Sequence, residues 1–151
     1  MLRIMKTEDY DAVYALWKSI KGLPILCVDD TYEGIKRFLL RNPLTSVVNE
    51  VDGRINGSIL CGHDGRRGFF YHVCVAEEAR MQGVGKAMVE FCKEALRQEG
   101  ITVITLFSYK HNKFGKPFWE KVGWKRRDDL NTYRFILNEE NIVIPSATHA
   151  N

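Results

Sequence analysis

The chain has 151 residues, of which 45% are hydrophobic and 27% are charged, and its formal net charge is +3. These values are ordinary for a folded domain, so they exclude a disordered chain and a fibrous repeat. Lysines and arginines are scattered among acids and no apolar run reaches the length of a membrane helix, so we expect neither a nucleic-acid partner nor a membrane partner.

The first third of the chain predicts one strand and two helices. The run LRIM, residues 2–5, is apolar and strand-like. The hydroxyl and acids of TED, residues 7–9, are typical of a helix start, and apolar residues at helical spacing extend this helix to about Ile20. A second, shorter helix begins with a cap at Asp30 or Thr31 and ends before the next proline.

The middle of the chain predicts three strands, a helix and a further strand. Residues 45–51 and 54–63 flank an Asp-Gly pair, which is a hairpin signal. Residues 69–76, FFYHVCVA, are apolar almost throughout, as in a central strand covered on both faces. The helix after Gly83 leads to another buried strand at 101–108, so these elements predict a βαβ crossover.

The last part of the chain predicts a helix, two closing strands and a tail. The helix spans roughly Phe114 to Val122, and the strands are residues 123–127 and 132–137. From Glu139 onward the residues are polar and small. We therefore expect one domain over residues 1–138 and a loosely attached polar tail over residues 139–151.

The cysteines and histidines show neither disulfide nor metal-ligand spacing, so we expect no metal site. Most of the cysteines stand in apolar runs, which predicts reduced, buried thiols. The first residues also lack the apolar run of a signal peptide, and a cytoplasmic protein is expected. The four cysteines are Cys27, Cys61, Cys74 and Cys92.

Two glycines, Gly83 and Gly85, stand where the central strand continues into its helix. A helix start presents unpaired amide groups and a partial positive charge, and glycine lets a phosphate approach the backbone. Arg80 and Lys86 add positive charge beside it. The stretch therefore predicts an anion cradle, with a tight turn that binds nothing as the alternative.

Two familiar phosphate-binding motifs fail here by spacing. A P-loop requires glycine where Arg80 stands and serine or threonine where Ala87 stands. A Rossmann fingerprint requires glycine or alanine at the position of Met88. A nucleotide-binding protein of another fold, which ATP or NAD would stabilise, is therefore disfavoured.

The pattern Arg80-x-x-Gly83-x-Gly85 after an apolar strand resembles the acetyl-CoA signature of the GNAT superfamily of N-acetyltransferases. Residues 111–124, HNKFGKPFWEKVGW, resemble the second signature of that family, and the resemblance covers about nine tenths of the chain, residues 2–137. It implies an α/β fold of the GNAT type. The expected sheet is mixed and mostly antiparallel, with about six or seven strands flanked by about four helices.

The resemblance implies acetyl-CoA (coenzyme A) as the cofactor. Its diphosphate would lie on the main-chain amides of residues 81–86, and its pantetheine arm would pair with the strand backbone at Val73 and Val75. Asn112 matches a position that contacts the cofactor from the last helix. The implied cofactor-binding residues are Val73, Cys74, Val75, Arg80, Met81, Gln82, Gly83, Val84, Gly85, Lys86 and Asn112.

Acetyl transfer needs a neutral amine, so a base is expected near the thioester. His72 and Tyr71 stand on the central strand, and a histidine satisfied in the core is the alternative for the former. Strand alternation places His72 opposite Val75 and places Tyr71 on the same face as Val75, unless a bulge shifts the register. A backbone amide of Cys74 or Val75 is expected to hold the oxyanion. An acyl-carrying role for Cys74 is disfavoured because the sequence shows no base for it.

Trp119 stands where many family members have a tyrosine that protonates the departing thiolate. Indole cannot supply that proton. Either Tyr109 or Tyr133 replaces the missing acid, or the thiolate leaves unassisted, which a thiol pKa of about 8.5 makes tolerable. We interpret Trp119 as a core aromatic, with substrate stacking as the alternative.

The loop at residues 21–34 is expected to set the acceptor. Asp29, Asp30 and Glu33 could attract a cationic amine, and capping of the second helix in contact with water is the alternative. The expected function is direct acetyl transfer to a primary amine of a small molecule or peptide. A CoA-binding sensor without catalysis is the alternative. The resemblance also implies a homodimer, for which the closing strands offer an edge.

Overall fold

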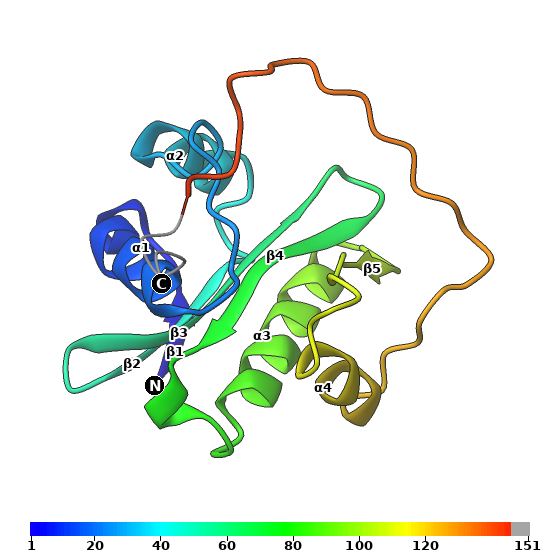
Figure 1. Ribbon diagram of the computed structural model, residues 1–151. Coiled ribbons are helices and arrows are strands. Elements are labelled where there is room, and N and C mark those ends of the chain that lie inside the picture. The colour runs from blue at the N-terminus through cyan, green and yellow to red at the C-terminus, as the bar shows by residue number, and fades with distance from the viewer. Residues whose placement is uncertain (146–151) are drawn as a thin grey trace. The chain divides into compact units, whose positions relative to one another are not determined.

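The predicted strands pair in chain order into one mixed sheet within residues 1–145, which this computed structural model describes (Figure 1). The first three strand pairs are antiparallel, and the last pair is parallel, as a βαβ crossover requires. The mixed, mostly antiparallel sheet is therefore confirmed. Its strands are β1 (Leu2–Ile4), β2 (Val47–Val51), β3 (Arg54–His63), β4 (Gly68–Val75) and β5 (Ile104–Thr105).

Helices cover both faces of this sheet, with α1 and α2 on one face and α3 on the other (Figure 1). Thr31, one of the two predicted caps, begins α2, because its hydroxyl accepts a hydrogen bond from the Gly34 amide at 3.1 Å. The helices are α1 (Tyr10–Ser19), α2 (Tyr32–Arg41), α3 (Val84–Gln98) and α4 (Gly115–Lys121), with short 3₁₀ turns η1 (Thr7–Asp9) and η2 (Glu77–Ala79).

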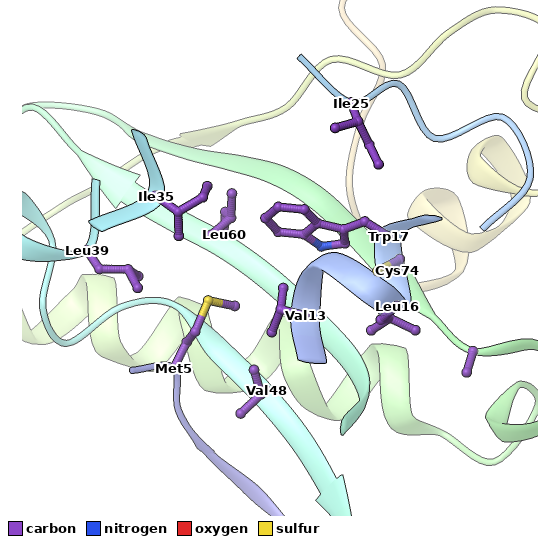
Figure 2. Packing of buried hydrophobic residues seen from close by; sticks show 11 residues of the cluster. Met5, Val13, Leu16, Trp17, Ile25, Ile35, Leu39, Val48, Leu60 and Cys74 are labelled. Carbon is purple, nitrogen blue, oxygen red and sulfur yellow. The ribbon is translucent and has the colours of Figure 1, made fainter. Parts of the chain in front are cut away.

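An apolar cluster fills the layer between the sheet and helices α1 and α2 (Figure 2). Trp17 of α1 is fully buried at its centre, and its indole N–H donates to the Ser58 hydroxyl of β3 at 3.1 Å. This bond satisfies the one polar atom of the ring and fixes its orientation. The buried members are Met5, Val13, Leu16, Trp17, Ile25, Ile35, Leu39, Val48, Leu60, Cys74 and Ala76.

The two predicted closing strands are wrong. Residues 123–127 and 132–137 form no strand among the residues that the structure describes, so the sheet has five strands there rather than six or seven. An apolar or alternating run becomes a strand only when a neighbour accepts its backbone hydrogen bonds. Around the first run the charges pair locally instead, as Arg126 and Asp128 do at 3.0 Å.

The described chain forms two compact units, one of Met1–Leu106 with the segment that starts at Glu140, and one of Phe107–Glu139. The second unit contains α4. In residues 1–145, no helix combines the length and apolar character needed to cross a bilayer. The predicted domain boundary after residue 138 stays a prediction.

The segment after Glu139 is not loosely attached where the structure describes it. The Cys27 amide donates to the Ile142 carbonyl at 2.9 Å, and the Ile144 amide donates to the Ile25 carbonyl at 2.7 Å. This segment therefore adds a short extended pairing to the loop between α1 and α2. Residues 146–151 of the predicted tail lie outside the described residues.

Thr7–Asp9 form η1, so α1 begins one turn later than the predicted start, and Asp9 ties this turn to β1. Arg3 donates to both carboxylate oxygens of Asp9 at 2.8 Å, and these hydrogen bonds hold the pKa of Asp9 below its ordinary value. A carboxyl whose pKa is lower in the folded state stabilises the fold above its unfolded pKa. That contribution is lost as the pH falls through the folded pKa.

We expect Asp9→Asn to lower the free energy of unfolding by about 1–3 kcal/mol at pH 7, because it removes a charge-assisted pair. Urea unfolding at a series of pH values measures this loss. The gap to the wild type should narrow as the pH falls below about 4, the ordinary pKa of an aspartate, and should close once the pH has passed the lower pKa of the folded carboxyl. A gap that stays constant on acidification would contradict this account.

Candidate functional site

The central strand β4 carries a β-bulge at His72. Cys74 pairs with Ser58 of β3, but Tyr71 pairs with Leu60, so β4 has one more residue than its partner in this interval. His72 takes the extra position with a φ of 48°, a left-handed conformation that costs a non-glycine residue about 1–2 kcal/mol. Bulges of this kind re-aim side chains and occur often next to active sites.

The bulge places Tyr71 and His72 on one face of the sheet. The Tyr71 ring lies against Phe38 of α2, with centroids 6.0 Å apart, and the His72 ring lies against Trp17 of α1, with centroids 4.6 Å apart. The prediction that Tyr71 shares the face of Val75 is therefore wrong, because the extra residue shifts the alternation. Both candidate bases face the layer of α1 and α2.

Val75 lies on the opposite face, as strand alternation predicts relative to His72. Its cross-strand partner is Gly57, and a Cβ built on Gly57 would meet the Met88 side chain of α3 at 3.0 Å. This contact shows that the Gly57–Val75 pair faces α3. The helix that follows the predicted cradle and the layer that holds His72 are therefore on different sides of β4.

Asp30 lies against His72, which the sequence pattern did not indicate. Asp30 Oδ1 is 2.8 Å from His72 Nε2, and Asp30 Oδ2 accepts the Leu26 amide at 2.7 Å. The residue is only 4% exposed. A buried carboxylate is stable only when it is paired, and here both oxygens have partners. The expectation that Asp30 binds a cationic acceptor or caps α2 in contact with water is therefore wrong.

The other acids of this loop are differently placed. Asp29 Oδ2 accepts from the Asn141 side-chain amide at 2.8 Å, and Asn141 Oδ1 accepts the amides of Val28 and Asp29 at 3.2 and 3.0 Å. Glu33 is exposed in the first turn of α2. No local pattern pointed to Asn141, because its partners lie more than a hundred residues earlier in the chain.

Two rival groups on the strand are poor reactants at neutral pH. Burial, and to a lesser extent the Asp29 charge, raises the pKa of Tyr71, so its phenolate is scarce as a base. Burial raises the pKa of Cys74 to about 11, against the smaller opposing effect of the hydrogen bond with Ser58. A thiol that stays protonated disfavours the acyl-carrying role. His72 is the better-suited base of these three.

The edge of β4 that faces away from β3 presents main-chain amides. The Ala76 amide donates to the Asn56 carbonyl of β3 at 2.8 Å, so by alternation the Cys74 amide also points toward β3. The amides of Val73 and Val75 then point to the other edge. Within residues 1–145, β5 pairs only with the first two residues of β4, which leaves that edge open. The expectation that the Cys74 amide holds the oxyanion is therefore wrong, because this amide points toward β3. The Val75 amide points toward the open edge, where an oxyanion donor is needed.

The turn from β4 to α3 has the geometry of an anion cradle. Met81 and Gly83 have positive φ values of 61° and 80°, and the first bond of α3 runs from the Ala87 amide to the Gly83 carbonyl at 3.0 Å. The amides of residues 84–86 precede that bond and are left for water or an anion. A Cβ on Gly83 would meet no protein atom within 4 Å, so the conformation, not crowding, requires glycine.

Arg80 and Gln82 hold this turn through their side chains. Arg80 Nε donates to the Val75 carbonyl at 3.1 Å, and Gln82 Nε2 donates to the Glu78 carbonyl at 3.1 Å. Lys86 is exposed in the first turn of α3. The predicted cofactor-binding residues of the turn therefore form one contiguous structure, and Arg80 links it to the open edge of β4.

The remaining predicted site residues belong to the unit of Phe107–Glu139. Asn112 Oδ1 accepts the amides of Phe114 and Gly115 at 3.2 and 3.0 Å, so its side chain holds the turn that leads into α4. Tyr109 stacks on the His111 ring, with centroids 5.2 Å apart. Its proposed role as an acid, that of the exposed Tyr133, and the cofactor contact of Asn112 stay predictions.

Trp119 is half-buried and contacts two aromatic rings of this second unit. Its ring lies 4.8 Å from the ring of Trp124 and 4.9 Å from that of Phe118, measured between centroids. Its carbonyl accepts the Trp124 amide at 2.9 Å. Because Trp119 is only half-buried, its role as a core aromatic and its role in substrate stacking both stay predictions.

Gly34 supports the turn that carries Asp30. A Cβ on Gly34 would lie 2.2 Å from the Asp29 carbonyl oxygen and 2.7 Å from that of Val28, and these backbone atoms cannot yield without moving the turn. Gly34→Ala should therefore cost about 1–3 kcal/mol of unfolding free energy by overpacking, measured in urea. The exposed Arg37→Ala on the same helix should cost less than about 0.5 kcal/mol. Equal stability of both variants would show that the turn is free to move.

Comparison with known proteins gives one consistent picture. The profile of the acetyltransferase (GNAT) family matches residues 10–124. An acetyltransferase of Pectobacterium atrosepticum is 30% identical over 138 residues, which are 91% of this chain and 96% of that protein.

Two solved structures share the fold at low identity. The PaiA N-acetyltransferase of Thermoplasma acidophilum, in complex with coenzyme A, has a TM-score of 0.74 at 14% identity, over 95% of each chain. The aminoglycoside N-acetyltransferase AAC(6')-Iy, in complex with CoA, has a TM-score of 0.69 at 16% identity, over 90% of this chain and 99% of that chain.

Proposed function

The chain belongs to the acetyltransferase (GNAT) family, and we propose that it transfers an acetyl group from acetyl-CoA directly to a primary amine of a small molecule or peptide. Membership of this family makes the protein an N-acetyltransferase with acetyl-CoA as the acetyl donor. The observation that carries the transfer to an amine is the buried pair of His72 and Asp30, on the strand whose open edge offers the Val75 amide.

The backbone between β4 and α3 fits the donor. The amides of residues 84–86 at the start of α3 suit a diphosphate, because they carry no intrahelical bond and add the partial positive charge of the helix end. The amides of Val73 and Val75 at the open edge suit the carbonyl groups of a pantetheine arm, which would pair as an added strand. Bound there, acetyl-CoA supplies the reactive thioester.

His72 addresses the main chemical obstacle. A lysine-like amine of pKa about 10.4 is neutral in roughly one molecule in 2,500 at pH 7, a cost of about 4.6 kcal/mol. An imidazole is suited to accept its proton at this pH. Because Asp30 holds Nε2, the other ring nitrogen, Nδ1, is the one available to the amine. The departing thiolate needs far less help, which is compatible with Trp119 at the position of the usual acid.

Incubating the protein with acetyl-CoA and a panel of amines tests the proposal. The panel should hold polyamines, amino acids, aminoglycosides and peptides with free amino groups. Thiol release and the mass of the acetylated product should both show steady turnover on at least one amine. Binding of acetyl-CoA without turnover on any class would overturn the proposal in favour of a CoA-binding sensor, which the tryptophan at 119 makes the second candidate.

We also propose a homodimer as the working assembly, which rests on the family resemblance alone. Sedimentation velocity at several protein concentrations measures it, and a single monomeric species throughout would refute it.

A further inference from the structure

We propose that Asp30 is a positioning residue that holds His72 in the tautomer with Nε2 protonated, and so leaves Nδ1 to receive the proton of the acceptor amine. The inference rests on the proposed function, because it takes His72 as the base. It replaces the role expected from the sequence, in which Asp30 attracts the amine itself.

The carboxylate of Asp30 is held in place from several sides. Oδ2 accepts the Leu26 amide at 2.7 Å, and the Asp30 amide donates to the Leu26 carbonyl at 3.2 Å. The Tyr10 hydroxyl of α1 donates to the Asp30 carbonyl at 2.8 Å. With its main chain and one oxygen fixed, the carboxylate can present only Oδ1 to His72. An ionised carboxylate only accepts hydrogen bonds, so the facing nitrogen must carry the proton.

The indole of Trp17 packs against the His72 imidazole and limits its movement. The Trp17 ring lies 4.6 Å from it between centroids, tilted by 55°, and Trp17 is itself fully buried and bonded to Ser58. The side chain of His72 is 12% exposed. The bulge, the indole and the carboxylate therefore jointly fix the imidazole of His72. Its tautomer and its orientation are set before an acceptor arrives.

Two groups contact the His72 imidazole directly. The Asp30 carboxylate is the charged group that contacts it, and the indole face of Trp17 attracts a cation. The other titratable groups packed around the pair are the Tyr10 hydroxyl on Asp30, the neighbouring Tyr71, and the Cys74 thiol beneath Ser58.

The proposed step balances with these groups. Nδ1 takes one proton from the ammonium form of the acceptor, and the neutral amine nitrogen then bonds to the acetyl carbon. The carbon–sulfur bond breaks with its electron pair going to sulfur, and the remaining extra proton of the nitrogen passes to the departing sulfur, which leaves as the thiol of CoA. Asp30 stays ionised and stabilises the imidazolium. Asp30 is unsuited to bind the ammonium form of the acceptor, because it is 4% exposed and both of its oxygens have partners.

Asp30→Asn tests this role with little change in shape. Asparagine can accept the Leu26 amide, but its NH₂ would donate to Nε2 and move the ring proton to Nδ1. We expect kcat to fall at least about 100-fold with KM changed less than about threefold, as when the orienting acid of a histidine base is lost. Asp11→Asn, which removes the same charge from an exposed position on α1, is the control and should keep both parameters.

A second readout follows the tautomer without any acceptor. Nitrogen-15 NMR of the imidazoles distinguishes protonated Nε2 from protonated Nδ1, and His72→Asn identifies the signal. The wild type should show Nε2–H in the neutral ring, and Asp30→Asn should show Nδ1–H.

The outcomes separate the inference from the proposed function. If His72→Asn abolishes turnover while Asp30→Asn keeps the wild-type tautomer and kcat, the inference is wrong and the base stands. If Asp30→Asn raises KM alone, the carboxylate binds the acceptor and the inference is again wrong. If His72→Asn keeps full turnover, the assigned base is wrong, and if no amine is acetylated by the wild type, the proposed function fails instead.

Discussion

Replacing His72 by asparagine should lower kcat/KM for the amine acceptor by about 100- to 10,000-fold, the usual contribution of a positioned general base. Asparagine is chosen because it tolerates a positive φ better than alanine, and His72 has a φ of 48°. The loss should therefore come from the missing imidazole rather than from the fold. The wild-type rate should decline on the acid side, where a protonated imidazole cannot accept, and the variant should lack that limb.

Steady-state kinetics across pH, together with calorimetric titration of CoA, provide the measurement. CoA affinity should stay within about threefold, because the cradle amides of residues 84–86 belong to a different part of the chain. The matched control is His63→Asn at the far end of β3, which removes an imidazole outside the site. Turnover within tenfold of the wild type in His72→Asn would assign the histidine to the core, with water or another group as the base.

Val84→Pro should weaken CoA binding by about 10- to 100-fold, the value of one hydrogen bond to a charged group. Val84 is the first residue of α3, and the first intrahelical bond starts only at the Ala87 amide. Proline is tolerated at the first position of a helix, so the substitution removes one cradle amide without breaking a helical bond. It also disfavours the ψ of 4° at the preceding Gly83, so it changes the turn as well as the amide. The variant therefore lacks a backbone hydrogen-bond donor that we assign to the diphosphate.

Val84→Ala is the matched variant, because it also removes the branched valine side chain but keeps the amide. The ratio of the two dissociation constants, measured by calorimetry, gives the combined contribution of the Val84 amide and the Gly83 turn. Pantetheine, which lacks the diphosphate, should bind both variants equally. Equal CoA affinities for proline and alanine at this position would show that the diphosphate is bound elsewhere.

The sequence by itself determined the elements whose causes are local. The Asp-Gly hairpin, the Thr31 cap and the apolar strands each depend on neighbouring residues, and the structure has them. The cradle belongs to the same class, because the amides at 84–86 and the left-handed Gly83 are contiguous in the chain. Main-chain amides at a helix start keep their direction whatever packs around them.

Only the tertiary structure decided the surroundings of His72, the residue that we propose as the base. The pairing of Asp30 with His72 joins residues 42 positions apart, and the bulge on β4 moves Tyr71 to the face of His72. The fate of 132–137, which alternates like a strand but has no partner in the described chain, was decided in the same way. Register, burial and strand pairing are free energies of contact between distant segments, so a local pattern of residue types does not specify them.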